Sequence, residues 1–405
     1  MGRRNKTVVG LDIGSTKVCT IIADAQGPTL DSIGFGETES RGLKKGVVVN
    51  LEATVDAIRK SVAEAEVMAG REVEEVFVGL AGPHIRSFNS KGTIPISGHA
   101  REITREDVRR VIETARAVAL APDREIIHII PQEFVVDDEE GIEDPHGMMG
   151  TRLEVNVHIV TSSVTAAQNI VTAVHRSGLE VADTVLEPIA AGETTLTDDE
   201  KELGCVLVDV GGGKTSVAIY HHGAVRHTVV LPIGSDNFTN DIAVGLRTPI
   251  PEAERLKRDH GCALASLADD ELSFEVAGVG LRQMRMIGQR VLGDILQPRA
   301  EEIIHFVRDE IRGAGYERQA GAGVILTGGG AVLRGMPELF EDLLDLPVRL
   351  GIPGGLSDAR FRRTEYATAV GLVAYGQRRR RTHDFHDQVG GALKRMVAKI
   401  RSVSF

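Results

Sequence analysis

Two stretches of the sequence decide the fold, VVGLDIGSTKVCTII at residues 8–22 and VLVDVGGGKTSVAIY at residues 206–220. Each reads as an apolar strand, an aspartate, one apolar residue, a glycine, two small residues, a lysine and a second strand. The matching positions are Asp12 with Asp209, Gly14 with Gly211, and Lys17 with Lys214. Copies this far apart predict two structurally related lobes rather than a short-period repeat.

The residue types of both turns suit a phosphate group. Small residues let backbone N–H groups approach and converge on an anion, hydroxyls add donors, and the lysines add positive charge. A carboxylate beside a phosphate needs a cation between them, so Asp12 and Asp209 predict Mg²⁺ held through water. The candidate phosphate-contacting residues are Asp12, Gly14, Ser15, Thr16 and Lys17 in the first turn, and Asp209, Gly211, Gly212, Gly213, Lys214 and Thr215 in the second.

Two common nucleotide motifs are excluded. A P-loop needs glycine where Val208 stands, and it opens a helix, whereas the residues after Lys214 continue as a strand. No GxGxxG occurs, so a dinucleotide-binding fold lacks its main signature. If only one such turn occurred, the preferred interpretation would be that the glycines simply connect two strands. The matched pair favours phosphate binding.

A third glycine-rich stretch, GVILTGGGAVLRGM at residues 323–336, reads as a strand, a triple glycine and a helix. Gly328, Gly329 and Gly330 would let the flat face of an adenosine lie against the backbone. Alone, a triple glycine is a weak signal, and it gains weight from the two phosphate turns.

The composition is that of an ordinary globular protein, with 405 residues, 42% apolar and 26% charged, and the length suggests two to four domains. No apolar run approaches the roughly 18 residues that cross a bilayer, so no span is expected. Cys19, Cys205 and Cys262 have no CxxC spacing and are expected to be reduced thiols in the cytoplasm. The histidines form no HExxH motif, so we expect no metal site of that kind.

Charge is concentrated at one end of the chain. Residues 376–405 hold eight basic side chains against Asp384 and Asp387, although the whole chain carries a net charge of −11. An acidic body with a basic tail predicts that the tail, and only the tail, meets an anionic surface.

The patterns along the chain predict α/β alternation with one inserted α+β module at about 84–162. In the module we expect strands at 92–96, 125–136 and 153–160, a helix at 103–120 opened by Thr104, and an acidic loop at 137–147. Elsewhere we expect helices at 52–69, 164–175, 187–196, 249–260 and 337–344, a largely helical stretch at 280–311, and strands at 75–80, 181–186, 206–210 and 323–327.

These motifs together resemble the superfamily of actin, sugar kinases and DnaK-type chaperones. DIGSTK resembles its first phosphate motif, DVGGGKTSVAI its second, TGGGAVLRG its adenosine motif, and VLEPIAAGE its first connecting helix. The implied fold is a two-lobed actin-like (ribonuclease H-like) α/β ATPase fold with an inserted α+β subdomain, and the implied ligand is ATP with Mg²⁺.

Within the superfamily the chain resembles the FtsA family of bacterial division proteins along nearly all its length. The position of the inserted module, the stretch HIVTSSVTAAQNIVTAVHRSGLEV before LEPIA, and a linker followed by a basic amphipathic segment carry the resemblance. The expected divisions are 1–83 with 163–195 and 357–377 for the first lobe core, 84–162 for the inserted subdomain, 196–228 with 300–356 for the second lobe core, 229–299 for the small subdomain of the second lobe, 378–390 for a basic flexible linker, and 391–405 for a membrane-targeting helix.

The resemblance also assigns residues. Glu254 and Lys257 in AERLK match the pair that touches ribose and adenine. Glu187 stands where relatives carry the group that positions the attacking water, which would make it catalytic. The alternative for Glu187 is a helix-start carboxylate stabilised by the helix dipole and followed by Pro188. ATP binding is therefore expected, and slow hydrolysis is left open.

The tail, GALKRMVAKIRSVSF at residues 391–405, has apolar residues at spacings of 3 and 4 with cations mainly off that stripe, the pattern of a helix lying in a membrane interface. The alternatives are docking on the protein's own body and nucleic-acid binding, which an acidic body and an apolar stripe disfavour. The expected lipid-facing residues are Leu393, Lys394, Arg395, Met396, Val397, Lys399, Ile400, Arg401, Val403 and Phe405.

The resemblance implies an ATP-binding protein that polymerises, anchors the FtsZ ring at the cytoplasmic face of the inner membrane, and recruits later division proteins at the septum. The C-terminal tail of FtsZ would dock around residues 229–299. Two rivals remain open, a PilM-like pilus-assembly scaffold and a sugar-kinase-type phosphotransferase.

Overall fold

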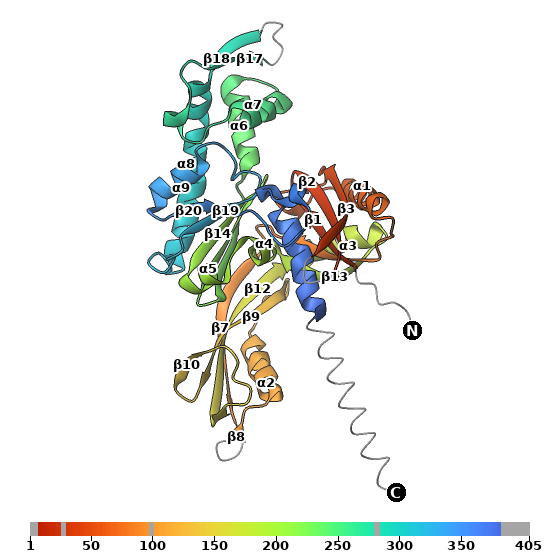
Figure 1. The fold of residues 1–405 in the computed structure, drawn as a ribbon, viewed down its shortest axis with the longest axis vertical. Helices are drawn as coiled ribbons and strands as arrows, with labels where there is room; N and C mark the ends of the chain where they lie inside the picture. Colours follow the sequence, from red (N-terminus) through yellow and green to blue (C-terminus); the bar gives the residue numbers. More distant parts are fainter. Residues whose placement is uncertain (1–6, 26–29, 97–100, 279–283, 382–405) are drawn as a thin grey trace.

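Two five-stranded sheets carry the two halves of the protein in the computed structural model, which describes residues 7–25, 30–96, 101–278 and 284–381 (Figure 1). The sheet of the first lobe has the order β13-β6-β1-β2-β3, and that of the second lobe the order β16-β15-β14-β19-β20. The strands of the first lobe are β1 (Thr7–Ile13), β2 (Lys17–Asp24), β3 (Asp31–Glu39), β6 (Glu75–Leu80) and β13 (Glu180–Leu186). Those of the second lobe are β14 (Cys205–Val210), β15 (Thr215–His221), β16 (Ala224–Leu231), β19 (Val324–Thr327) and β20 (Val348–Leu350).

The two sheets share one topology. In each, the strand that carries the motif aspartate pairs antiparallel with the next strand, which pairs with a third. On its other side the same strand begins a run of two further parallel strands. The prediction of two related lobes from the repeated motif is therefore confirmed, as is the two-lobed α/β fold.

Helix α1 (Leu51–Ala69) illustrates how local sequence signals and packing agree. The Asn50 side chain caps it by accepting from the Ala53 N–H, and it ends at Gly70, which has φ 63°. The helix lies so close to β3 that a Cβ on Gly36 would be 1.9 Å from the Ser61 carbonyl oxygen. Glycine is thus required at that position.

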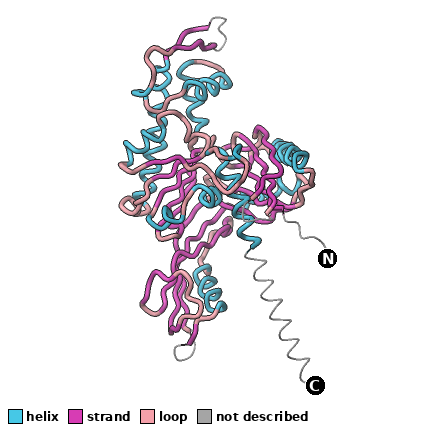
Figure 2. The backbone as a smooth tube through the Cα atoms, viewed as in Figure 1, coloured by secondary structure: helices cyan, strands magenta, loops and turns pink. Residues whose placement is uncertain are grey.

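The inserted subdomain is a four-stranded sheet, in the order β10-β9-β12-β7, with α2 on one side of it (Figure 2). Thr104 and Asp107 form a capping box that opens α2, as predicted, but the helix ends at Arg116 rather than near residue 120. The expected acidic loop at 137–147 is wrong in part: it contains β10, because Asp137 adopts φ 57° and turns the chain back onto β9. The elements are β7 (Arg86–Pro95), β8 (Arg101–Glu102), α2 (Arg105–Arg116), β9 (Arg124–Val136), β10 (Glu139–Ile142), β11 (Met149–Gly150) and β12 (Arg152–Ser163).

The remaining helices surround the two sheets, and a small subdomain of the second lobe ends in a hairpin (Figure 2). The expectation of helix over 280–311 is wrong at its start, because Met284–Gly288 pairs antiparallel with Ser273–Ala277 and the helix begins only at Gln289. The elements are β4 (Leu43–Lys44), β5 (Val47–Val48), α3 (Val164–Arg176), α4 (Glu187–Thr195), α5 (Asp198–Leu203), α6 (Ser235–Leu246), α7 (Ile250–His260), β17 (Ser273–Ala277), β18 (Met284–Gly288), α8 (Gln289–Gly313) and α9 (Met336–Leu344).

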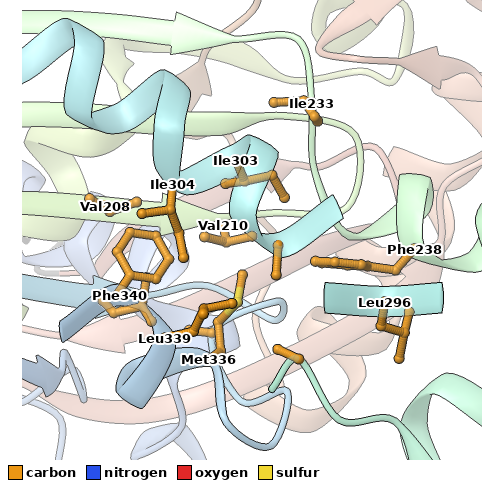
Figure 3. Packing of buried hydrophobic residues seen from close by; sticks show 14 of the residues in the cluster. Val208, Val210, Ile233, Phe238, Leu296, Ile303, Ile304, Met336, Leu339 and Phe340 are labelled. Atoms are coloured by element: carbon orange, nitrogen blue, oxygen red, sulfur yellow. The ribbon is translucent and has the colours of Figure 1, made fainter. Parts of the chain in front are cut away.

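The core of the second lobe lies between its sheet and these helices. Figure 3 shows Val208 and Val210 of β14 facing Ile304 of α8, with Phe340 of α9 filling the space beside them. Each of these side chains is fully buried, which excludes water from the base of the strand that carries Asp209.

The last helix of the described chain, residues 367–381, crosses the first lobe. Gly10 of β1 and Gly371 of the helix allow backbone to approach backbone, since a Cβ on Gly371 would be 1.9 Å from the Ala190 carbonyl oxygen of α4. The expected flexible linker is wrong for residues 378–381, which are helical. Arg378 pairs with Glu193 at 2.6 Å, Arg379 with Asp183 at 3.5 Å, and Arg380 with Glu75.

Residues 382–405 lie outside the described residues, and with them the rest of the expected linker and the expected membrane-targeting helix. Within the part of the chain that the structure describes, no helix has both the length and the apolar character that crossing a bilayer requires.

We predict that Gly371→Ala destabilises the fold by about 1–3 kcal/mol, because the new methyl group would meet the α4 backbone rather than a movable side chain. Thermal or denaturant unfolding of the full chain measures the change. Gly313→Ala is the matched control: its Cβ would meet nothing within 4 Å, and it sits in α8. Helix propensity should make that variant neutral or more stable by about 0.5–1 kcal/mol. Equal stability of the Gly371→Ala variant and the wild type would contradict the close helix contact.

Candidate functional site

A cleft of about 730 Å³ opens between the two lobes and collects almost all of the predicted nucleotide-binding residues. It also includes Glu187, the predicted catalytic residue. Thr215 is the exception: it is buried, it does not line the cleft, and its hydroxyl donates to the Ile233 carbonyl oxygen at 2.8 Å. The predicted residues that line the cleft are Asp12, Gly14, Ser15, Thr16, Lys17, Asp209, Gly211, Gly212, Gly213, Lys214, Glu254, Lys257, Gly328, Gly329 and Gly330.

The two glycine turns have the same backbone geometry. In the first, the Gly14 N–H donates to the Lys17 carbonyl at 2.9 Å, and in the second the Gly211 N–H donates to the Lys214 carbonyl at 2.9 Å. The turns also face each other across the cleft, since a Cβ on Gly212 would be 1.9 Å from the Thr16 hydroxyl. The glycines are therefore required by the opposite turn as well as by any bound anion.

The second turn is braced from behind by residues that the sequence analysis missed. The N–H groups of Ser235 and Asp236, at the start of α6, donate to the carbonyls of Gly211 and Gly212, each at 2.8 Å. No local motif identifies Ser235, because its hydrogen bond to Gly211 depends on the position of the chain after β16.

Asp12 and Asp209 stand at matching positions near the ends of β1 and β14, and both border the cleft. Burial, with a further contribution from the nearby Glu187, raises the pKa of Asp12 to about 7 and that of Asp209 to about 6. The Thr368 hydroxyl donates to Asp209 at 3.2 Å. Two desolvated carboxylates at one site are costly when both are charged, and a cation would relieve that cost.

The two lysines of the motifs are each paired with a carboxylate. Lys214 is buried, bonded to Glu187 at 2.7 Å and to the Ala81 carbonyl at 3.3 Å. Glu187 is the first residue of α4 and also lines the cleft. The two positions considered for it, in the site and at a helix start, are therefore both observed. Its carboxylate is engaged by the ammonium of Lys214.

Lys17 pairs with Glu37 of β3 at 2.9 Å and lies 3.8 Å from the centre of the Tyr366 ring. Glu37 and Tyr366 were missed by the sequence analysis, because they come from distant parts of the chain and carry no motif. Because each lysine is paired with a carboxylate, and Asp12 and Asp209 lie beside them, the end of the cleft formed by the glycine turns has no excess positive charge. A polyphosphate would therefore need an accompanying cation there.

The triple glycine follows β19 and comes directly against the second motif. Gly328 has φ 87°, and a Cβ there would be 2.3 Å from an Asp209 carboxylate oxygen. The expected helix does not follow at once: residues 331–335 form turns and a bend with a β-bridge from Arg334 to Cys262, and α9 begins at Met336. These residues carry the chain from the end of β19 to the second-lobe core, where Phe340 of α9 is buried.

Glu254 and Lys257 lie on α7 as a fixed pair, 2.7 Å apart. Lys257 also donates to the Thr239 hydroxyl of α6 at 2.9 Å, and Arg258 bonds to Glu254 at 2.8 Å. The predicted ribose and adenine contacts thus form one polar wall of the cleft, joined to the helix that braces the second glycine turn.

The donor set suits a hard divalent cation shared with phosphate. In the described ranges, no group of three or more His, Cys, Asp or Glu side chains is arranged to hold a metal ion. Mg²⁺ is usually bound in proteins by one or two carboxylates with waters and substrate phosphates, which matches the pair formed by Asp12 and Asp209.

Two protein-family models match the chain. The model described as "Cell division protein FtsA" matches residues 206–371, and the one described as "SHS2 domain inserted in FTSA" matches residues 82–161. The chain is 47% identical to Cell division protein FtsA of Pseudomonas aeruginosa over 92% of this chain and 89% of that one. It is 38% identical to Cell division protein FtsA of Escherichia coli K12 over 92% of this chain and 90% of the relative, and 38% identical to that of Bacillus subtilis over 93% and 85%.

Solved structures share the fold at low sequence identity. A PilM-PilN type IV pilus biogenesis complex matches with a TM-score of 0.68 and 17% identity, covering 93% of this chain and 99% of that one. MreB5 of Spiroplasma citri bound to ADP matches with a TM-score of 0.55 and 14% identity, covering 96% and 99%. These likenesses show an actin-like fold.

We predict that Asp209→Asn stabilises the ligand-free protein at pH 7 by on the order of 2 kcal/mol. The folded pKa of about 6 is above the ordinary 3.8, so the stability cost of the charged carboxylate grows as the pH rises between these values. The gain should therefore be full above pH 6 and vanish near pH 4. Unfolding measured across this pH range checks it, and a gain independent of pH would contradict burial of the charge as the cause.

Proposed function

The chain belongs to the FtsA family of bacterial cell division proteins, and from this membership we propose that it binds ATP with Mg²⁺ and assembles at the division site. In this proposal the protein polymerises, fastens the FtsZ ring to the cytoplasmic face of the inner membrane, and recruits later division proteins at the septum. The observation that carries nucleotide binding is the pair of like glycine turns facing each other across one cleft with Asp12 and Asp209.

The chemistry of the site supports Mg-ATP more than free ATP. Backbone N–H groups of the two turns would hold the phosphates, and Asp12 and Asp209 would hold the cation through water. The two lysines are already paired with Glu37 and Glu187, so the cation would supply the positive charge that balances the phosphates. Glu254 and Lys257 would meet the ribose and base, with Gly328, Gly329 and Gly330 against the adenosine.

We propose nucleotide binding with slow hydrolysis rather than rapid turnover. Glu187 is the residue whose position suits activation of water, and the Lys214 ammonium holds its carboxylate at 2.7 Å. A general base has to offer a free lone pair to the attacking water. Lys214 occupies one carboxylate oxygen of Glu187, so water would have to be activated through the other oxygen beside this ion pair, and in this proposal the nucleotide serves mainly to set the closure of the lobes.

Membrane attachment rests on the amphipathic sequence of residues 391–405. Each basic side chain near an anionic leaflet contributes at most about 1 kcal/mol to binding, and the apolar stripe adds about a few kcal/mol more. The cost of ordering the helix opposes both contributions. One tail would therefore bind reversibly. A filament would present many tails together and hold the membrane firmly without any new contact.

The family provides the remaining assignments. The FtsZ C-terminal tail would dock on the small subdomain of the second lobe, around residues 229–299. A PilM-like scaffold shares the fold, but identity to the pilus complex is 17% against 47% to the P. aeruginosa division protein. A sugar-kinase-type phosphotransferase has no observation in its favour beyond the shared fold.

We predict that calorimetry detects binding of Mg-ATP, and that Asp12→Asn and Asp209→Asn each weaken it at least about tenfold. The carboxylates have raised pKa values of about 7 and 6 and must be deprotonated to hold the cation. Binding should therefore weaken as the pH falls from 8 to 6 and should release protons. Unchanged affinity in both variants would remove nucleotide binding between the two turns from the proposal.

We predict that deleting residues 391–405 abolishes sedimentation of the protein with vesicles that contain anionic phospholipid. Calorimetry with Mg-ATP on the same variant is the control, because the deletion lies outside the cleft and should leave nucleotide binding unchanged. Membrane attachment through this segment would be wrong if the truncated protein sediments like the full chain.

A further inference from the structure

Residues 364–368 form a fourth element of the cleft, although they belong to none of the glycine-rich motifs. They comprise the 3₁₀ turn Thr364–Tyr366 and the first two residues of the helix 367–381. Three of them line the cleft, Thr364, Glu365 and Thr368. The sequence analysis did not identify this segment, and yet it contacts all three glycine-rich stretches.

Tyr366 fixes the segment to the first lobe. Its ring packs edge-on against Phe35 of β3 and against Phe361, with ring centres 5.8 Å and 5.7 Å away. The ammonium of Lys17, at the end of the first glycine turn, lies 3.8 Å from the centre of the same ring. The segment is therefore held at the first-lobe core, beside the first glycine turn.

Two threonines of the segment reach across to the second lobe. The Thr364 hydroxyl donates to the Gly328 carbonyl oxygen at 2.9 Å, and the Gly328 N–H donates to the Thr364 carbonyl oxygen at 3.3 Å. The Thr368 hydroxyl donates to Oδ2 of Asp209 at 3.2 Å. Thr364 is 3% exposed and Thr368 is 6% exposed, so little water competes for these hydrogen bonds.

The Asp209 carboxylate is held on two sides as a result. Its Oδ2 accepts from Thr368, and its Oδ1 lies against Gly328, where a Cβ would be only 2.3 Å from that oxygen. Gly328 is itself bonded to Thr364. The first-lobe segment thus contacts one carboxylate oxygen directly and places the residue that packs against the other.

We propose that Thr368 is a positioning residue for Asp209, and that it keeps the carboxylate in the orientation that holds the Mg²⁺ of Mg-ATP. This inference rests on the proposed nucleotide binding. A group that hydrogen-bonds a metal-binding carboxylate restricts its rotation, and such a partner commonly contributes about tenfold to a hundredfold to metal affinity. Because the hydrogen bond joins the two lobes, the cation would be held best in the arrangement of the lobes seen here.

The alternative role for Thr368 is to tie the two lobes together and nothing more. In that role its loss would weaken nucleotide binding whether or not Asp209 can take part in holding the cation. The positioning role predicts instead that the effect of Thr368 on affinity passes through the Asp209 carboxylate. A double-mutant cycle separates the two roles, because it measures whether the effects of the two residues are additive.

The test is calorimetry of Mg-ATP binding to the full-length protein carrying Thr368→Val, which replaces the hydroxyl by a methyl group of similar size. We expect the affinity to fall about tenfold or more, and Thr368→Ser, which keeps the hydroxyl, to retain most of the wild-type affinity. In the Asp209→Asn protein, at nucleotide concentrations high enough to saturate it, Thr368→Val should cause no further loss. With EDTA in place of Mg²⁺, Thr368→Val and the wild type should bind ATP equally. Thermal unfolding of each variant verifies that folded proteins are compared.

Thr195→Val is the matched control. Thr195 is also buried, at 4% exposure, and its hydroxyl donates to the Ala191 carbonyl oxygen at 2.8 Å within α4, but it does not line the cleft. This variant loses the same chemical group and should bind Mg-ATP like the wild type.

The outcomes separate this inference from the proposed function. If Thr368→Val binds Mg-ATP as tightly as the wild type while Asp209→Asn binds it weakly, the positioning role is wrong and nucleotide binding stands. The positioning role is also wrong if Thr368→Val causes the same loss of affinity with EDTA, or the same loss in the Asp209→Asn protein. If the wild type does not bind Mg-ATP, the nucleotide binding of the proposed function is wrong, and the positioning role is wrong with it.

Discussion

The constraint on which the rest of this structure depends is the presence of two carboxylates in one cleft, one buried and one half-buried. Asp12 and Asp209 come from matching strands of the two lobes, and desolvation raises the pKa of both. The surrounding residues affect the free energy of charging these two carboxylates. Lys214 is held by Glu187, Thr368 donates to Asp209, and the glycines leave room where a cation and its phosphates would enter. A ligand that carries positive charge would lower the cost of charging both carboxylates.

The helix at 367–381 joins this cleft to the opposite side of the first lobe. Residues just before and at its start contact the second lobe: the Thr364 hydroxyl donates to the Gly328 carbonyl oxygen and the Thr368 hydroxyl donates to Asp209. It continues past α4 with backbone almost touching backbone at Gly371 and ends in arginines bonded to the sheet edge. One helix thus contacts the cleft at one end and the sheet of the first lobe at the other.

Much of the architecture could be predicted from the sequence because it is encoded locally. The apolar, β-branched residues on both sides of the turns at Asp12 and Asp209 predicted both hairpins, and Thr104 predicted the start of α2. The errors arose where pairing partners decided the outcome. Residues 284–288 became a strand by pairing with 273–277, and 139–142 became a strand by pairing with β9. Arginines that looked like a solvated linker stayed helical because carboxylates of the first lobe pair with them.

By itself, the sequence predicted from residue type and spacing that two glycine turns and their aspartates form one site, and the cleft brings them together. That the site binds phosphate stays a prediction. Only the tertiary structure decided which charges cancel, where Thr215 points, and that residues 7 and 380 touch. The physical reason is range. Turn and strand preferences act over a few residues, whereas an ion pair such as Lys17 with Glu37, or a contact such as Arg380 with Thr7, exists only after sheet register and helix packing have brought distant segments together.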